Sequence, residues 1–197
     1  MLTYSIKNST LFISTRNSNN ERISSEFFKD CCKSNKIYSM KSVNSICISG
    51  NINSIGESAF MNIQQIKSIK IIPNVVCSIA NNAFSYNQRL TTVEMNAKIL
   101  SIGPSAFEDC PNLSDVTLGE SLVIIGRRAF ADDKSLKSIR IPHTVDFCSE
   151  DAFIGTCIDK TYLENVKRSI QCRNESLYKT TPAGLHYKEV TKYKRGE

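Results

Sequence analysis

The side chains of this 197-residue chain that are best suited to chemistry are its two histidines and eight cysteines. His143 precedes Cys148 by five residues, and an imidazole close to a thiol is the pair that nucleophilic catalysis by cysteine needs. His143 follows Pro142 where a turn is expected, and Cys148 occupies a position that a repeating pattern elsewhere fills with isoleucine. His186 also falls in no motif. We therefore interpret Cys148 as a core residue and predict no catalytic residue and no enzyme activity.

Three pairs of adjacent carboxylates are the second candidate for chemistry, because paired acids can exchange a proton or bind calcium. The pairs are Glu108-Asp109, Asp132-Asp133 and Glu150-Asp151. They lie around Ala-Phe dipeptides in segments expected to turn, where charged side chains face water. We favour solvation of the turns over carboxylate chemistry. The sequence has no glycine-rich phosphate-binding loop either, so no cofactor is predicted.

The cysteines form neither a CxxC pair nor a recognisable zinc spacing. They are Cys31, Cys32, Cys47, Cys77, Cys110, Cys148, Cys157 and Cys172. We expect most of them to be small core residues or isolated thiols, as in a protein of a reducing compartment. The sequence therefore predicts no metal site and no disulfide framework.

Most of these residues lie within a repeat. Ala-Phe occurs five times, at spacings of 24, 23, 23 and 23 residues. The five phenylalanines are Phe60, Phe84, Phe107, Phe130 and Phe153. A second column of apolar residues, which begins at Val43 and ends at Leu136, has the same period. Self-similarity at a fixed period of this size is typical of a solenoid.

Each repeat starts with a segment in which apolar and polar residues alternate, which indicates a strand with one buried face. The expected strands are Val43–Ile48, Ile66–Ile71, Leu90–Met95, Leu113–Leu118 and Leu136–Ile141. A turn with Gly56, Gly103 or Gly126 follows in three repeats, and Pro104 suits the first position of a short helical turn. The repeated phenylalanines should be covered by the coils on either side.

The pattern L-x-x-V-x-I, V-x-x-I-G-x-x-A-F-x-x-C resembles the BspA-like leucine-rich repeat over residues 43–157. The resemblance implies an α/β-type repeat solenoid: a curved, right-handed stack with a parallel concave β-sheet and short helical turns on the other side. It also implies a family of surface and interaction proteins from anaerobic bacteria and protists. Ala80 and the pair Cys148-Ser149 depart from the pattern, so we expect their coils to be less regular.

We divide the chain into five parts: a polar N-terminal arm (1–22), a degenerate capping coil (23–42), five repeats (43–157), a C-terminal cap (158–182) and a mobile basic tail (183–197). The capping coil is inferred from Phe28 and Cys31, which match Ala-Phe-x-x-Cys. The C-terminal cap would contain a last strand at 158–163 and an amphipathic helix at 163–170. No secretory signal or membrane span is recognised, which favours a cytoplasmic location. Cell-surface exposure by a non-classical route is the alternative.

The net charge of +6 comes from the two ends of the chain. Residues 43–157 carry nine Lys or Arg and eleven Asp or Glu, so the repeats are slightly acidic and the flanks are basic. Basic flanks can bind nucleic acid or an anionic surface. We favour solvated caps, and keep this binding as the third functional hypothesis.

The first hypothesis is a monomeric protein-interaction or adhesion module that binds a protein partner through its concave sheet. The second is an intracellular scaffold that uses the same surface. The expected contact residues alternate with the buried strand residues: Ser68, Lys70, Thr92, Glu94, Asp115, Thr117, Ser138 and Arg140. Lys70 and Arg140 would flank Glu94 and Asp115, and we expect no aromatic anchor, so the sequence predicts a polar contact that is weak or multivalent.

Overall fold

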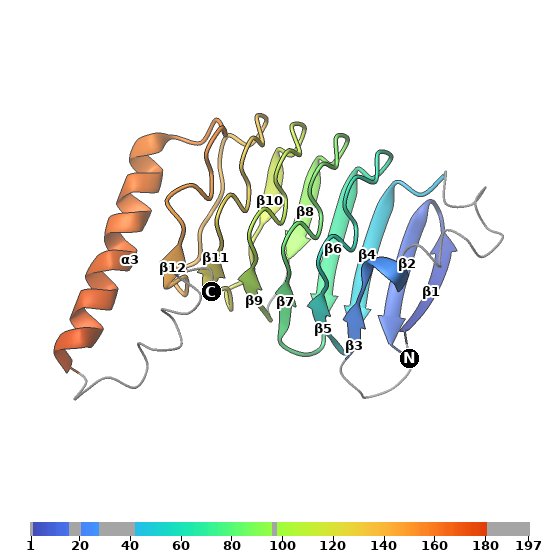
Figure 1. Ribbon diagram of the computed structural model, residues 1–197, viewed down its shortest axis with the longest axis horizontal. Helices are drawn as coiled ribbons and strands as arrows, with labels where there is room; N and C mark the ends of the chain where they lie inside the picture. Colours follow the sequence, from blue (N-terminus) through green and yellow to red (C-terminus); the bar gives the residue numbers. More distant parts are fainter. Residues whose placement is uncertain (1, 16–20, 28–41, 96–97, 181–197) are drawn as a thin grey trace.

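The computed structural model describes residues 2–15, 21–27, 42–95 and 98–180, which wind into a solenoid with two sheets (Figure 1). The first sheet consists, in spatial order, of β1 (Leu2–Lys7), β2 (Thr10–Thr15), β4 (Ser45–Gly50), β6 (Ser68–Pro73), β8 (Thr92–Met95) and β10 (Asp115–Thr117). The second sheet consists of β3 (Glu21–Ile23), β5 (Ile52–Ile55), β7 (Cys77–Ile79), β9 (Ile99–Ile102), β11 (Ile124–Ile125) and β12 (Phe147–Cys148). All strand pairs except β1 with β2 are parallel, which confirms the predicted parallel-sheet solenoid.

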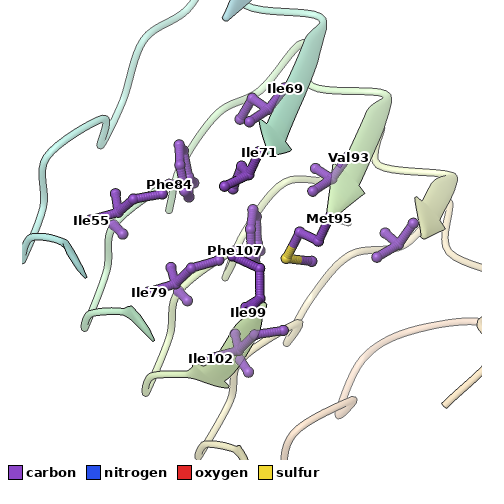
Figure 2. Close-up of a cluster of buried hydrophobic side chains, with 14 of the residues drawn as sticks. Ile55, Ile69, Ile71, Ile79, Phe84, Val93, Met95, Ile99, Ile102 and Phe107 are labelled. Atoms are coloured by element: carbon purple, nitrogen blue, oxygen red, sulfur yellow. The ribbon is translucent and has the colours of Figure 1, made fainter. Parts of the chain in front are cut away.

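The strands form where the sequence alternates, because each inward residue meets its counterpart in the next coil. Ile46 pairs in register with Ile69, and Ile69 with Val93, and all three are buried. Figure 2 shows the core between the two sheets, where Ile71 and Met95 from the first sheet lie near Phe84, Phe107 and residues of the second. Each coil therefore depends on its neighbours for burial.

The repeated phenylalanines form one continuous stack through the core. Neighbouring ring centroids lie 5.2 to 5.4 Å apart, and the planes deviate from parallel by 2 to 8°. Phe60, Phe84, Phe107 and Phe130 are fully buried. This confirms that a single coil is too thin to cover its own phenylalanine.

The Ala-Phe segments are turns of a non-helical type and not the short helical turns expected from the sequence. The Ala106 amide donates to the Gly103 carbonyl at 3.3 Å, and Ser105, the residue between Pro104 and Ala106, has a φ of 54°. A proline at the second position of a four-residue turn and a positive φ at the third position are characteristic of a type II turn. Ser58, Asn82 and Arg128 take the same backbone conformation before their alanines. Pro104 is compatible with a helical turn and with a type II turn, so its presence could not distinguish the two.

The coils with unusual turn residues keep the hydrogen bond of the regular ones. The Gly103 amide donates to the Ile79 carbonyl at 2.8 Å, and the amides of Ala80 and Ser149 make the matching bonds at 2.8 and 3.0 Å. The expectation that the coils would be less regular at Ala80 and Ser149 is therefore wrong for this hydrogen bond, because the bond involves only backbone atoms. The irregularity lies elsewhere in the fifth repeat, where residues 136–141 form no strand although Ile139 is buried.

The N-terminal segment corrects the expectation of a polar arm over residues 1–22. Residues 2–15 form the antiparallel hairpin of β1 and β2, and β2 pairs in parallel with β4. Leu11 and Ile13 are fully buried, and their alternation with polar residues outweighs the polar composition around them. Phe28 and Cys31, which suggested the degenerate capping coil, lie outside the described residues.

Helix α3 (Lys160–Thr180) follows the last coil and replaces the strand expected at 158–163. Asp159 caps the helix, because its Oδ1 accepts a hydrogen bond from the Tyr162 amide at 2.7 Å. Figure 1 shows α3 at the end of the stack opposite β1. Among the described residues, no helix is long and apolar enough to cross a membrane. The expected mobile tail, 183–197, lies outside them.

Candidate protein-binding surface

Six of the eight expected contact residues lie on the outer face of the first sheet, and the other two continue it. Ser68 and Lys70 belong to β6, where they alternate with the buried Ile69. Thr92, Glu94, Asp115 and Thr117 follow the same alternation in β8 and β10. Ser138 and Arg140 are exposed on either side of Ile139, although no strand forms there.

The strand register arranges these side chains in two columns across the sheet. One column contains Ser45, Ser68, Thr92 and Asp115, and the other Cys47, Lys70, Glu94 and Thr117. In the first column, Ser68 Oγ donates to Ser45 Oγ at 2.8 Å. The alternation in the sequence therefore identified both columns.

The positive side chains on this face are paired with carboxylates. Lys70 Nζ lies 2.7 Å from Glu94 Oε2 on the neighbouring strand, and the hydrogen bond raises the pKa of Lys70. Arg140 Nη2 lies 3.1 Å from Glu120 Oε1. Lys70 is thus paired with Glu94, which belongs to the expected acidic centre, while Arg140 is paired with Glu120 outside the two columns. Asp115, Arg140 and Tyr162 border a shallow hollow at the C-terminal end of the face.

An aromatic residue that the sequence reasoning missed stands at the opposite end of this face. Phe12 in β2 is paired in register with Cys47, and its side chain is 40% exposed. The expectation of a face without aromatic residues is therefore wrong. The sequence did contain a signal for a strand here, because the buried Leu11 and Ile13 lie on either side of Phe12. The surrounding Asn and Ser residues suggested a polar arm instead.

The structure does not support a nucleophilic pair of Cys148 and His143. His143 is exposed and its Nδ1 lies 3.6 Å from Glu120 Oε2. The Cys148 thiol donates to the Ser149 carbonyl at 3.7 Å, and burial raises its pKa to about 11. A thiol with so high a pKa carries little thiolate at neutral pH.

Members of the acidic pairs bind side chains of their own coil and of the neighbouring one. Arg128 Nη2 lies 2.7 Å from Glu108 Oε1 and 2.8 Å from Asp132 Oδ2. Burial alone would raise the pKa of Glu108, but hydrogen bonds from Arg128 and Ser105 outweigh it and lower the pKa. Asp151 accepts from Ser149 Oγ at 2.6 Å. Across the described residues, no group of three or more metal-binding side chains occurs.

Six cysteines lie in the described part of the chain, and all six are free thiols there. Cys77 and Cys110 are buried, and burial raises the pKa of Cys77 to about 12 and that of Cys110 further. Cys157 and Cys172 are exposed. The prediction that Cys110 is a core residue is confirmed.

Comparisons with known proteins agree with this architecture. A family model described as "BspA type Leucine rich repeat region (6 copies)" matches residues 33–159. A comparison with curated protein sequences finds no match.

Three solved structures are similar to the chain. A leucine-rich repeat protein from Eubacterium ventriosum has 30% identity and a TM-score of 0.50, with 60% of this chain and 32% of that one covered. The T. pallidum leucine-rich repeat protein TpLRR has 16% identity and a TM-score of 0.54, with 85% and 92% covered. The pneumococcal vaccine antigen PcpA has 18% identity and a TM-score of 0.53, with 79% and 46% covered. The chain thus spans about a third of the first protein and less than half of the third, and the last two likenesses show the fold alone.

Proposed function

Because this chain belongs to the BspA-type leucine-rich repeat family, we propose that it is a non-enzymatic module that binds a protein partner through the outer face of its first sheet. Proteins of this family are typically surface or interaction proteins. The observation that carries the proposal is the register of this face, which aligns hydroxyl, charged and aromatic side chains from β2 to β10.

The chemistry of the face favours a polar contact with one apolar anchor. Ser68 and Thr92 can donate and accept hydrogen bonds, and Lys70 and Glu94 present both signs of charge. Phe12 supplies the large apolar group that interface hot spots commonly contain. A partner that matches these groups in order would also fix its own register on the sheet.

The size of the face favours weak or multivalent binding. Six positions from Phe12 to Arg140, at about 4.8 Å per strand, span about 24 Å, and four residues along each strand span about 13 Å. The resulting area of roughly 300 Å² is below the ~800 Å² that each partner buries in a standard interface. Contacts with the exposed charges should also weaken as salt is added.

Nucleic-acid binding through the basic ends is the alternative from a different class, and two of the basic side chains outside the repeats have partners in the last coil. On α3, Lys167 Nζ donates to the Glu150 carbonyl at 3.0 Å, and Arg173 Nη2 donates to the Val145 carbonyl at 2.7 Å. These two cations contact the last coil. The adhesion and intracellular scaffold hypotheses use the same face, and surface labelling of intact cells distinguishes them.

The test uses a partner captured with the wild-type protein and then reverses the charges of the face in K70E/E94K/R140E. The exchange at positions 70 and 94 keeps an ion pair between the two strands, so the fold should be retained. We expect the dissociation constant, measured on a biosensor, to rise at least about tenfold. The matched control is Lys134→Glu, which reverses an exposed charge on a turn. Unchanged binding by the folded triple variant would place the contact on another face.

A further inference from the structure

A second column of outward residues crosses the second sheet. The paired positions, in spatial order, are Arg22, Ser54, Ser78, Ser101, Ile124 and Phe147. A groove of about 470 Å³ runs along this column, which is within the roughly 300–1,000 Å³ of ligand-binding pockets. The sequence reasoning assigned no function to this side of the repeats.

Small residues line much of the groove. Ser54, Ser78 and Ser101 lie along its middle, and Gly103 and Gly126 lie where the strands enter the turns. The groove is more enclosed than the shallow hollow beside Asp115 on the first sheet. A longer side chain at any of the three serine positions would fill part of it.

The serine hydroxyls in the groove are available to a ligand. Within the described residues, the side chains of Ser54, Ser78 and Ser101 make no hydrogen bond. On the first sheet, by contrast, Ser45 and Ser68 bond to each other. Three open hydroxyls in line can each donate one hydrogen bond and accept others from a ligand that crosses the strands.

The charge of the lining is positive. Arg22 lies at one end and Arg127 towards the other, and no Asp or Glu is among the described residues that line the groove. Arg127 is 77% exposed and reaches its neighbour Asp151 only at 3.5 Å. The end that contains Arg127 is also apolar, because Ile124 and Phe147 are partly exposed there. The groove therefore presents two separated cations, a hydroxyl centre and one apolar end.

We infer that this groove binds an extended acidic peptide segment of a protein partner, with an apolar side chain against Ile124 and Phe147. Five strand intervals of about 4.8 Å give a length of about 24 Å, which corresponds to about seven residues at about 3.3 Å each. Two arginines four strand intervals apart are too distant to bind one small anion together. Two cations are also few for a nucleic acid strand, whose phosphates would face the uncharged serines. The inference does not rest on the first-sheet face.

The experiment measures fluorescence anisotropy of labelled heptapeptides with the full chain. One peptide carries four acidic residues and a terminal leucine, one has the reversed order, and one replaces the acids with lysines. A labelled octanucleotide of thymidine is the nucleic-acid probe. We expect one of the two acidic peptides to bind in the micromolar range, with at least tenfold weaker binding as salt rises from about 0.05 to about 0.5 M.

Two variants localise the binding. R22E/R127E should weaken acidic peptide binding at least about tenfold, and Ser78→Trp should block it by filling the groove. Lys134→Glu and the first-sheet triple variant should bind the peptide like the wild type, which separates this site from the proposed function. Tighter binding of the lysine peptide or of the oligonucleotide, no acidic peptide binding below about 1 mM, or equal binding by folded R22E/R127E would overturn the inference.

Discussion

Asp133 Oδ1 accepts a hydrogen bond from the Cys110 amide of the preceding coil at 2.8 Å, while Asp133 Oδ2 is buried without a partner among the described residues. Asn87 occupies the equivalent position two coils earlier. Its Oδ1 accepts from the Ile63 amide at 2.7 Å, and its Nδ2 donates to the carbonyls of Phe60 and Phe84 at 2.9 and 2.7 Å. An ionised carboxylate cannot make the two donor bonds that the amide makes.

The first prediction is that the free energy of unfolding decreases with pH because of Asp133. Burial raises the pKa of Asp133 to about 8; the Cys110 amide lowers it, and the nearby charges of Asp109, Asp132 and Glu108 raise it. The unfolded chain loses this proton near pH 4 and the folded protein near pH 8, so stability falls between these values by up to ~1.4 kcal/mol per pH unit and then levels off. Urea denaturation at pH 5, 7 and 9 measures the trend.

Asp133→Asn is the matched variant for this prediction. It should abolish the contribution of position 133 to the pH dependence and raise the free energy of unfolding at pH 9 by about 1–3 kcal/mol. Asp115→Asn removes an exposed carboxylate and should leave the slope as in the wild type. A variant D133N with the wild-type slope would show that another group causes the dependence.

The second prediction concerns the phenylalanine stack. Phe107 lies between Phe84 and Phe130, 5.2 Å from each ring, so Phe107→Ala leaves a cavity that both neighbouring coils line. We expect the free energy of unfolding to fall by ~3–5 kcal/mol in chemical denaturation. Phe12→Ala is the control, and because that side chain is 40% exposed its cost should be much smaller. Equal costs would contradict a continuous packed stack.

The third prediction concerns the end of the second sheet. Arg173 Nη2 and Asn174 Nδ2 of α3 donate to the carbonyls of Val145 and Asp146 beside β12, at 2.7 and 3.0 Å. The double variant R173A/N174A should loosen α3, expose the sheet edge and increase aggregation, which light scattering detects. Removal of residues 183–197 should leave the protein soluble. Equal scattering from the two proteins would argue against a capping role for α3.

The fourth prediction concerns the thiols. Since the six described cysteines are free, a reducing agent should not change the melting temperature. Under native conditions an alkylating reagent should modify the exposed Cys157 and Cys172 quickly, and Cys77 and Cys110 only after unfolding. Peptide mass spectrometry measures the order. A large fall in melting temperature on reduction would mean that a disulfide had been overlooked.

The sequence predicted best the positions that the repeat itself constrains. Phe107 and Ile69 recur because a buried position in one coil must match the next, so periodicity alone located them. Leu11 and Ile13 obey the same rule, but they belong to a single hairpin, where one short alternation cannot be distinguished from a polar arm. The turn at Pro104 was misassigned because its backbone depends on the positive φ of Ser105, for which the serine side chain gives no signal.

The one-coil spacing of the backbone pairing determines how the protein responds to a pulling force. Ser45 pairs with Ser68, 23 residues further along the chain, so the hydrogen bonds between coils run along the axis of the stack. A force applied to the two ends of the repeats loads the junctions between coils in series, so the weakest junction opens first. The protein should therefore lengthen in steps, each releasing one coil of about 80 Å of extended chain, and its mechanical strength should be that of its weakest coil.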